Sequence, residues 1–152
     1  MPQKKRAVPQ DISAPSWLHD QRTDCFSALM QIRTGDYLEL VEEAHRQRGG
    51  IAGQREVLKT TTAKRIRNRM ISDIQAGAVL PPVVIGVVVD AATAAKLANG
   101  KHNQADLLGC IAGKELSIID GMQRTASLLE AGTADSAVFD RYMRVEFWIA
   151  KG

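Results

Sequence analysis

One short stretch constrains the fold of this chain more than any other, because an apolar strand pattern runs directly into Asp120-Gly121 and then into a helical pattern. Glu115–Ile119 is rich in β-forming residues, and the apolar residues after the glycine recur at i, i+4 and i+7. This spacing predicts a strand, a tight glycine turn and a helix that ends near Gly132. The side chains predicted to form the buried stripe of this helix are Met122, Ala126 and Leu129.

The predicted turn also has the chemistry of an anion site. The first N–H groups of a helix lack partners within the helix, and the helix dipole adds about half a positive charge at that end. Arg124 lies beside those N–H groups and off the apolar stripe, so a phosphate is the natural ligand. A purely structural interpretation stays open, in which the Asp120 carboxylate caps the helix and Arg124 is a solvated charge.

The composition is that of one folded domain. The chain has 152 residues, of which 45% are hydrophobic and 24% are charged, and its net charge is +3. This mildly basic balance permits a nucleotide or nucleic-acid partner without requiring one. Residues 1–20 are predicted to be a flexible leader, since prolines and the triplet Lys4-Lys5-Arg6 dominate its start, and residues 21–152 form the predicted domain.

Neither a membrane segment nor a metal site is predicted. The chain contains no run of about 18 or more apolar residues, so no membrane partner is expected and a cytoplasmic location is the default. Cys25 and Cys110 are far apart, and the three histidines are scattered. This spacing indicates neither a zinc site nor a redox dithiol, and both thiols are expected to be reduced.

The remaining patterns mix strands and helices without a regular βαβ order, which favours an α+β fold. The β-branched run Val83–Val89 predicts a buried strand at the centre of the sheet. No phosphate-loop, dinucleotide-binding or serine-hydrolase motif occurs in the sequence. The other predicted elements are a strand at 26–32, a helix from Thr34 to Gly49-Gly50, a helix from Thr62 to Gly77, a short helix at 91–98, a hairpin of 107–111 with 115–119, and a strand at 143–149.

The helix predicted from Thr62 to Gly77 combines an apolar stripe with a basic surface. A solvated charged face and a DNA-contacting face both fit this pattern, although no aromatic residues interleave with the charges for base stacking. The predicted stripe is Ala63, Ile66, Met70 and Ile74, and the candidate DNA contacts are Arg65, Arg67 and Arg69.

The pentapeptide Asp120-Gly121-Met122-Gln123-Arg124 resembles the Asp-Gly-Gln-His-Arg signature of DGQHR-domain proteins, which belong to the ParB/sulfiredoxin-like superfamily. Upstream, the order of Gly49-Gly50, Gln54-Arg55 and Leu80–Ile85 is similar to the order of elements in that family. The resemblance covers roughly residues 25–150. It implies a ParB/sulfiredoxin-like mixed sheet with flanking helices.

By this resemblance, the turn would bind nucleotide phosphates, and Gln54 and Arg55 would line the same pocket. Asp120 would orient the turn or a metal-bound phosphate. Gln123 stands where the family has histidine, and glutamine cannot act as a general base at neutral pH, so its part would be a hydrogen bond to phosphate or ribose. The implied phosphate ligands are Gly121, Met122, Gln123, Arg124 and Thr125, and the implied catalytic residues are Asp120, Gln123 and Arg124.

The function implied is a nucleoside triphosphate-binding domain that hydrolyses its nucleotide and acts with DNA in a bacterial DNA-modification or anti-phage defence system. ATP is the first candidate nucleotide and Mg²⁺ the candidate ion. The alternative is a non-catalytic DNA-binding transcriptional regulator that uses the three arginines of the basic helix. A homo-oligomer is compatible with either, and an end directly after a strand suggests that the chain is part of a longer protein.

Overall fold

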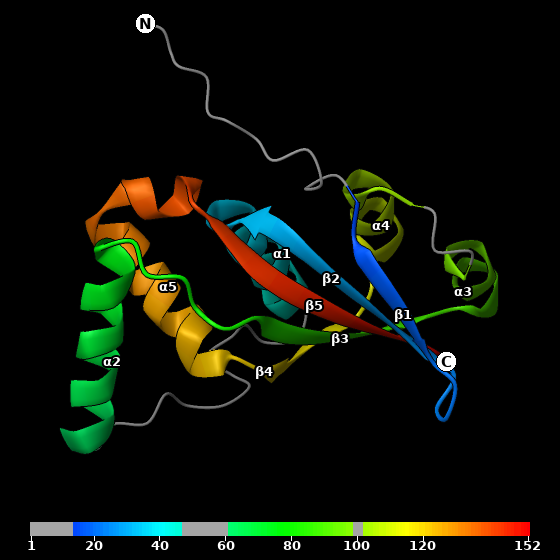
Figure 1. Ribbon diagram of the computed structural model, residues 1–152, viewed down its shortest axis with the longest axis horizontal. Helices are drawn as coiled ribbons and strands as arrows, with labels where there is room; N and C mark the ends of the chain where they lie inside the picture. Colours follow the sequence, from blue (N-terminus) through cyan, green and yellow to red (C-terminus); the bar gives the residue numbers. More distant parts are fainter. Residues whose placement is uncertain (1–13, 47–60, 99–101) are drawn as a thin grey trace, which may run out of the picture.

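In the computed structural model, which describes residues 14–46, 61–98 and 102–152, five strands form one mixed sheet with flanking helices (Figure 1). The strand order is β1-β2-β5-β3-β4. The α+β class predicted from the sequence is therefore confirmed. The strands are β1 (Ser16–Asp20), β2 (Cys25–Arg33), β3 (Val83–Val89), β4 (Leu116–Asp120) and β5 (Tyr142–Lys151). The helices are α1 (Thr34–Arg46), α2 (Thr61–Gln75), α3 (Ala91–Leu97), α4 (Gln104–Ile111), α5 (Met122–Ala134) and the 3₁₀ helix η3 (Ser136–Asp140).

β5 is the middle strand of the sheet. It pairs antiparallel with β2 on one side and parallel with β3 on the other. β1 and β4 add antiparallel partners at the two edges. The prediction that β3 lies at the centre of the sheet is wrong. A β-branched run is typical of an interior strand, and β3 is one, but the local sequence does not indicate which interior strand takes the middle position.

The sheet buries only one of its faces. Val145, Phe147 and Ile149 of β5 are buried, and the helices cover the face that carries them, with α1 lying behind the strands in Figure 1. On the opposite face Val88 is 51% exposed. β3 is thus a half-buried strand and not the fully buried one that its composition predicts. The helices contribute Tyr37, Ile74, Leu97, Leu107 and Leu128 to the shared core.

Two elements differ from their predicted form. Residues 107–111, predicted as one arm of a hairpin, belong to α4, whose first turn is closed by reciprocal hydrogen bonds between Asn103 and Asp106. Leu107 and Ile111 are buried at i, i+4 spacing, so the apolar run has helical and not strand periodicity. The second element is β1, which lies at Ser16–Asp20 within the predicted leader and pairs with β2.

The buried stripes of α2 and α5 also differ from those predicted. Ile66 of α2 is 58% exposed, although Ile74 on the same predicted stripe is buried. In α5 Leu128 is buried, whereas Leu129, which lies on the predicted stripe, is 46% exposed. Ser127, predicted to lie off the stripe, is fully buried. The reason is that α5 packs against α2, η3 and α1 together, so its contacts do not follow a single apolar stripe.

The end of α2 is fixed by Arg141, at the junction of η3 and β5. The Arg141 guanidinium donates hydrogen bonds to the carbonyl oxygens of Ile74 and Gln75 in the last turn of α2, where carbonyls lack the usual helical partners. The Ile74 carbonyl also accepts from the Gly77 N–H, at 2.9 Å. The backbone N–H and the hydroxyl of Thr34 both donate to the Arg141 carbonyl, at 2.8 and 2.9 Å. One arginine thereby joins α2 to the start of α1.

Cys25 and Cys110 are free thiols, each half-buried. None of the helices within the described ranges has both the length and the apolar character needed to cross a bilayer. Across the same ranges, no group of three or more His, Cys, Asp or Glu side chains is arranged to hold a metal ion.

Candidate anion site at the start of α5

The turn between β4 and α5 requires glycine. Gly121 is buried and has φ of 118° and ψ of 20°, a left-handed conformation that residues with a Cβ rarely adopt. A Cβ at this position would lie 2.8 Å from Val83 Cγ1, so β3 presses directly on the turn. Both the backbone angle and the close approach therefore depend on the missing side chain.

No side chain caps the N-terminus of α5 within the described structure. The first backbone bond of the helix runs from the Thr125 N–H to the Gly121 carbonyl, at 2.8 Å. The amides that precede Thr125 in the helix have no carbonyl one turn earlier to receive them. The structural interpretation in which Asp120 caps this helix is thus not what the chain adopts.

Arg124 is held beside this N-terminus. Its Nη2 donates to the Pro82 carbonyl at 2.9 Å and lies 3.3 Å from Asp120 Oδ2. The Arg124 side chain is 18% exposed and the Asp120 side chain 69% exposed, so the pair lies at the surface with its guanidinium turned inward. Arg124 Nε is buried and has no hydrogen-bond partner among the described residues.

Thr125 belongs to a buried chain of hydroxyl groups. Its Oγ1 donates to the Gly121 carbonyl at 2.8 Å and lies 2.8 Å from the Tyr37 hydroxyl. Because the single Thr125 proton is used by the carbonyl, the Tyr37 hydroxyl must be the donor to Thr125. Burial of Tyr37 raises its pKa to about 12, although the charge of Arg124 acts in the opposite direction.

The predicted site residues are distributed unevenly around the turn. Asp120, Gly121 and Arg124 come together, and Met122 and Gln123 are half-buried in the first turn of α5. Thr125 is buried, and its hydroxyl is directed into the protein. Gln54 and Arg55 lie outside the described residues.

The basic residues of α2 are mainly on its surface. Arg65 and Arg69 are exposed, whereas Arg67 is half-buried. α2 packs along α5, which brings this basic helix next to the one that begins at the turn (Figure 1).

Sequence reasoning missed two contributors to the turn. The Pro82 carbonyl and the Tyr37 hydroxyl hold Arg124 and Thr125, at sequence separations of 42 and 88 residues. No local pattern signals such contacts.

Three cavities of about 540, 120 and 30 Å³ are lined by described residues, and residues 120–125 line none of these three.

Comparison with known proteins adds no relative: no protein-family model, no curated protein and no solved structure matches the chain.

Substitution of Gly121 with alanine measures how much the fold depends on glycine at this position. Gly121→Ala should reduce the free energy of unfolding by about 3 kcal/mol, because it combines a left-handed backbone with the Val83 contact. Gly77→Ala is the matched control: Gly77 also has a positive φ, of 99°, but nothing lies within 4 Å of its added Cβ. That variant should lose about 1 kcal/mol in urea unfolding. Equal losses would contradict the close approach of β3.

The buried Tyr37 hydroxyl predicts a loss of stability in alkali. The pKa of about 12 in the folded state exceeds the ordinary value of 10.0, so the folded chain holds this proton more tightly than the unfolded one. The resulting stability is fully present below about pH 10 and is lost as pH rises towards 12, by about 3 kcal/mol in total.

Denaturant unfolding across that pH range measures this effect. Tyr37→Phe should remove the corresponding decline, at a cost of about 1 kcal/mol at neutral pH for the lost hydrogen bond. Tyr142→Phe, which leaves Tyr37 in place, should retain the decline. A Tyr37→Phe variant with the same alkaline profile as the parent would show that Tyr37 does not cause it.

Proposed function

We propose that this chain binds the phosphates of a nucleoside triphosphate at the start of α5. The observation that carries the proposal is the uncapped N-terminus of α5, which follows a left-handed glycine and has the Arg124 guanidinium beside it. Unpaired backbone N–H groups, a helix dipole and a cation in the same helical turn favour a phosphate. The resemblance of residues 120–124 to the DGQHR signature supports the same ligand.

Asp120 makes the proposal more specific. Its carboxylate is largely exposed and lies 3.3 Å from Arg124 Nη2, so an incoming phosphate would meet a negative charge next to the positive one. Mg²⁺ commonly binds through one or two carboxylates together with substrate phosphates. The residues present fit such an ion in this limited sense, with Asp120 as its protein ligand, and the ion would neutralise charge on the phosphates.

The larger role that we propose is hydrolysis of the nucleotide in a bacterial DNA-modification or anti-phage defence system, by a ParB/sulfiredoxin-like domain. Gln123 would donate a hydrogen bond from its half-buried place in the first turn. ATP is the first nucleotide to test. This role rests on the resemblance, and the phosphate site rests on the turn, so the two are tested separately.

Calorimetric titration with ATP, CTP and GTP, each with and without Mg²⁺, tests the phosphate site. At least one nucleotide should bind with a dissociation constant on the order of micromolar, and Arg124→Ala should weaken it by about tenfold or more. Arg144→Ala removes the same charge from an exposed position on β5 and should leave binding unchanged. Release of inorganic phosphate measures hydrolysis independently.

A second variant guards against loss of folding in Arg124→Ala, since Arg124 also holds Pro82. Asp120→Asn changes an exposed side chain and should tighten nucleotide binding several-fold without Mg²⁺, while weakening it when Mg²⁺ is present. If none of the three nucleotides binds the parent chain, or if Asp120→Asn behaves like Arg144→Ala, the turn is not a phosphate site.

A second candidate function is DNA binding without catalysis, and the exposure of Arg65 and Arg69 on α2 favours it. These side chains are four residues apart, so they lie on the same side of the helix and can reach neighbouring phosphates. On this alternative the α5 turn is structural.

The salt dependence of DNA binding separates the two functions. With a short labelled duplex, Arg65→Ala and Arg69→Ala should each flatten the plot of log affinity against log salt by about one unit. Arg22→Ala, at an exposed position in the turn between β1 and β2, should leave the slope unchanged. Nucleotide titrations of the α2 variants should match the parent, and equal slopes for all three variants would exclude α2 as the DNA surface.

A further inference from the structure

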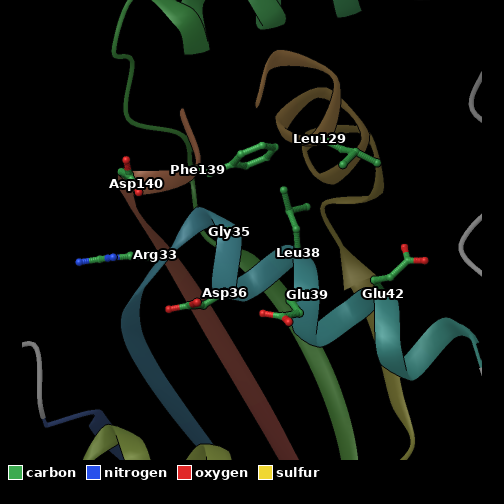
Figure 2. Close-up of a pocket in the computed structure, with 9 residues that line it drawn as sticks. All are labelled: Arg33, Gly35, Asp36, Leu38, Glu39, Glu42, Leu129, Phe139 and Asp140. Atoms are coloured by element: carbon green, nitrogen blue, oxygen red, sulfur yellow. The ribbon is translucent and has the colours of Figure 1, made fainter. Parts of the chain in front are cut away.

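A groove of about 540 Å³ lies where α1, α5 and η3 meet, and the anion site makes no use of it (Figure 2). Gly35 fits the start of α1 closely against η3, since its added Cβ would lie 3.3 Å from the Phe139 carbonyl oxygen. The residues that line the groove are Arg33, Gly35, Asp36, Leu38, Glu39, Glu42, Leu129, Phe139 and Asp140.

The floor of the groove is apolar. Figure 2 shows Leu38, Leu129 and Phe139 converging from three different elements. The Phe139 ring rests on Gly132, where an added Cβ would lie 2.2 Å from Phe139 Cε1, so the ring is fixed in place. Leu129 is 46% exposed, although it lies next to the buried Leu128. The floor therefore presents apolar area that the described fold leaves uncovered.

The rim of the groove is acidic. Asp36, Glu39 and Glu42 come from α1, and Asp140 comes from the end of η3. The one basic lining residue, Arg33, has its guanidinium carbon 5.9 Å from the centre of the Tyr142 ring. Because the whole chain has a net charge of +3, the negative rim is a local feature. Asp36 lies in the first turn of α1, where its negative charge interacts favourably with the helix dipole. Asp140 comes from another element and has no such role.

From the apolar floor and the acidic rim we infer that this groove docks a cationic amphipathic peptide segment of a partner protein. An apolar side chain of the peptide covers Leu129 and Phe139, and flanking lysine or arginine side chains lie against the carboxylates of Asp36, Glu39 and Asp140. The negative charge of the rim favours a cationic peptide, because the same rim repels nucleotides, DNA and anionic lipid surfaces. The described residues also provide no metal-binding cluster here.

This inference stands apart from the proposed nucleotide site. The groove shares no lining residue with the turn at residues 120–125, and its charge has the opposite sign. A failure to bind nucleotides would therefore leave the groove proposal intact, and a failure to bind the peptide would leave the proposed nucleotide site intact.

Fluorescence anisotropy with a labelled lysine–leucine peptide, designed with all leucines on one helical face, tests the proposal. The peptide should bind saturably, and its affinity should fall as salt rises. Glu39→Lys and Leu129→Gln should each weaken binding about fivefold, because one reverses a rim charge and the other removes apolar area from the floor.

Matched controls are available for both variants. Glu130→Lys makes the same charge change at an exposed site on α5 outside the groove, and Leu18→Gln makes the same polarity change at an exposed site on β1. Both should bind the peptide as the parent does. A glutamate–leucine peptide should not bind.

Four results would overturn the proposal. The first is that the lysine–leucine peptide does not bind saturably, and the second is that the groove variants and their controls weaken its binding equally. The third is that a peptide of lysine alone binds with equal affinity. The fourth is that the chain self-associates, that Leu129→Gln abolishes this self-association, and that the lysine–leucine peptide does not bind. The last result would assign the groove to a second copy of this chain.

Discussion

The alternation of side chains along β5 is the constraint on which the rest of the structure depends. Its inward residues are buried, and it pairs with β2 on one side and β3 on the other, so a shift of one residue would turn that apolar set towards solvent. The same register fixes β3. Pro82, directly before β3, supplies a carbonyl that binds Arg124, and Val83, the first residue of β3, supplies the side chain that contacts Gly121. The candidate anion site is therefore a consequence of sheet register.

The turn combines rigidity on its inner side with openness on its outer side. On the inner side, Val83 packs against Gly121. The Tyr37 hydroxyl donates to the Thr125 hydroxyl, which in turn donates to the Gly121 carbonyl. Outside, the first amides of α5 lack a side-chain cap, and Asp120 is directed to Arg124 instead. On the proposed function, these fixed inner contacts would limit the reorganisation that binding of a phosphate requires.

The parts of the fold that could be predicted are those with strong local sequence patterns. The bounds of β3 follow from its continuous β-branched run, and the strand–glycine–helix order of β4 and α5 follows from the spacing of apolar residues around Gly121. α4 could not be separated from a strand because its apolar run is short, and the choice of Leu128 over Leu129 as core residue depends on three packing partners at once. In the candidate site, the glycine and arginine are visible in the sequence, whereas the contacts that orient them come from distant residues. The groove could not be predicted, since its lining comes from α1, α5 and η3.

The candidate anion site and the groove lie on shared helices. Tyr37 of α1 faces Thr125 in the interior, while its neighbour Asp36 lines the groove, so consecutive residues of one helix serve the two regions. α5 does the same with Arg124 in its first turn and Leu129 further along. Exposed charges are screened over about 8 Å at physiological ionic strength, so each surface acts mainly on the ligand in contact with it. If both proposals hold, the two sites need no moving part to separate their ligands: the acidic rim disfavours polyanions at the groove, whereas phosphate binding at the turn depends on Arg124 and the first amides of α5.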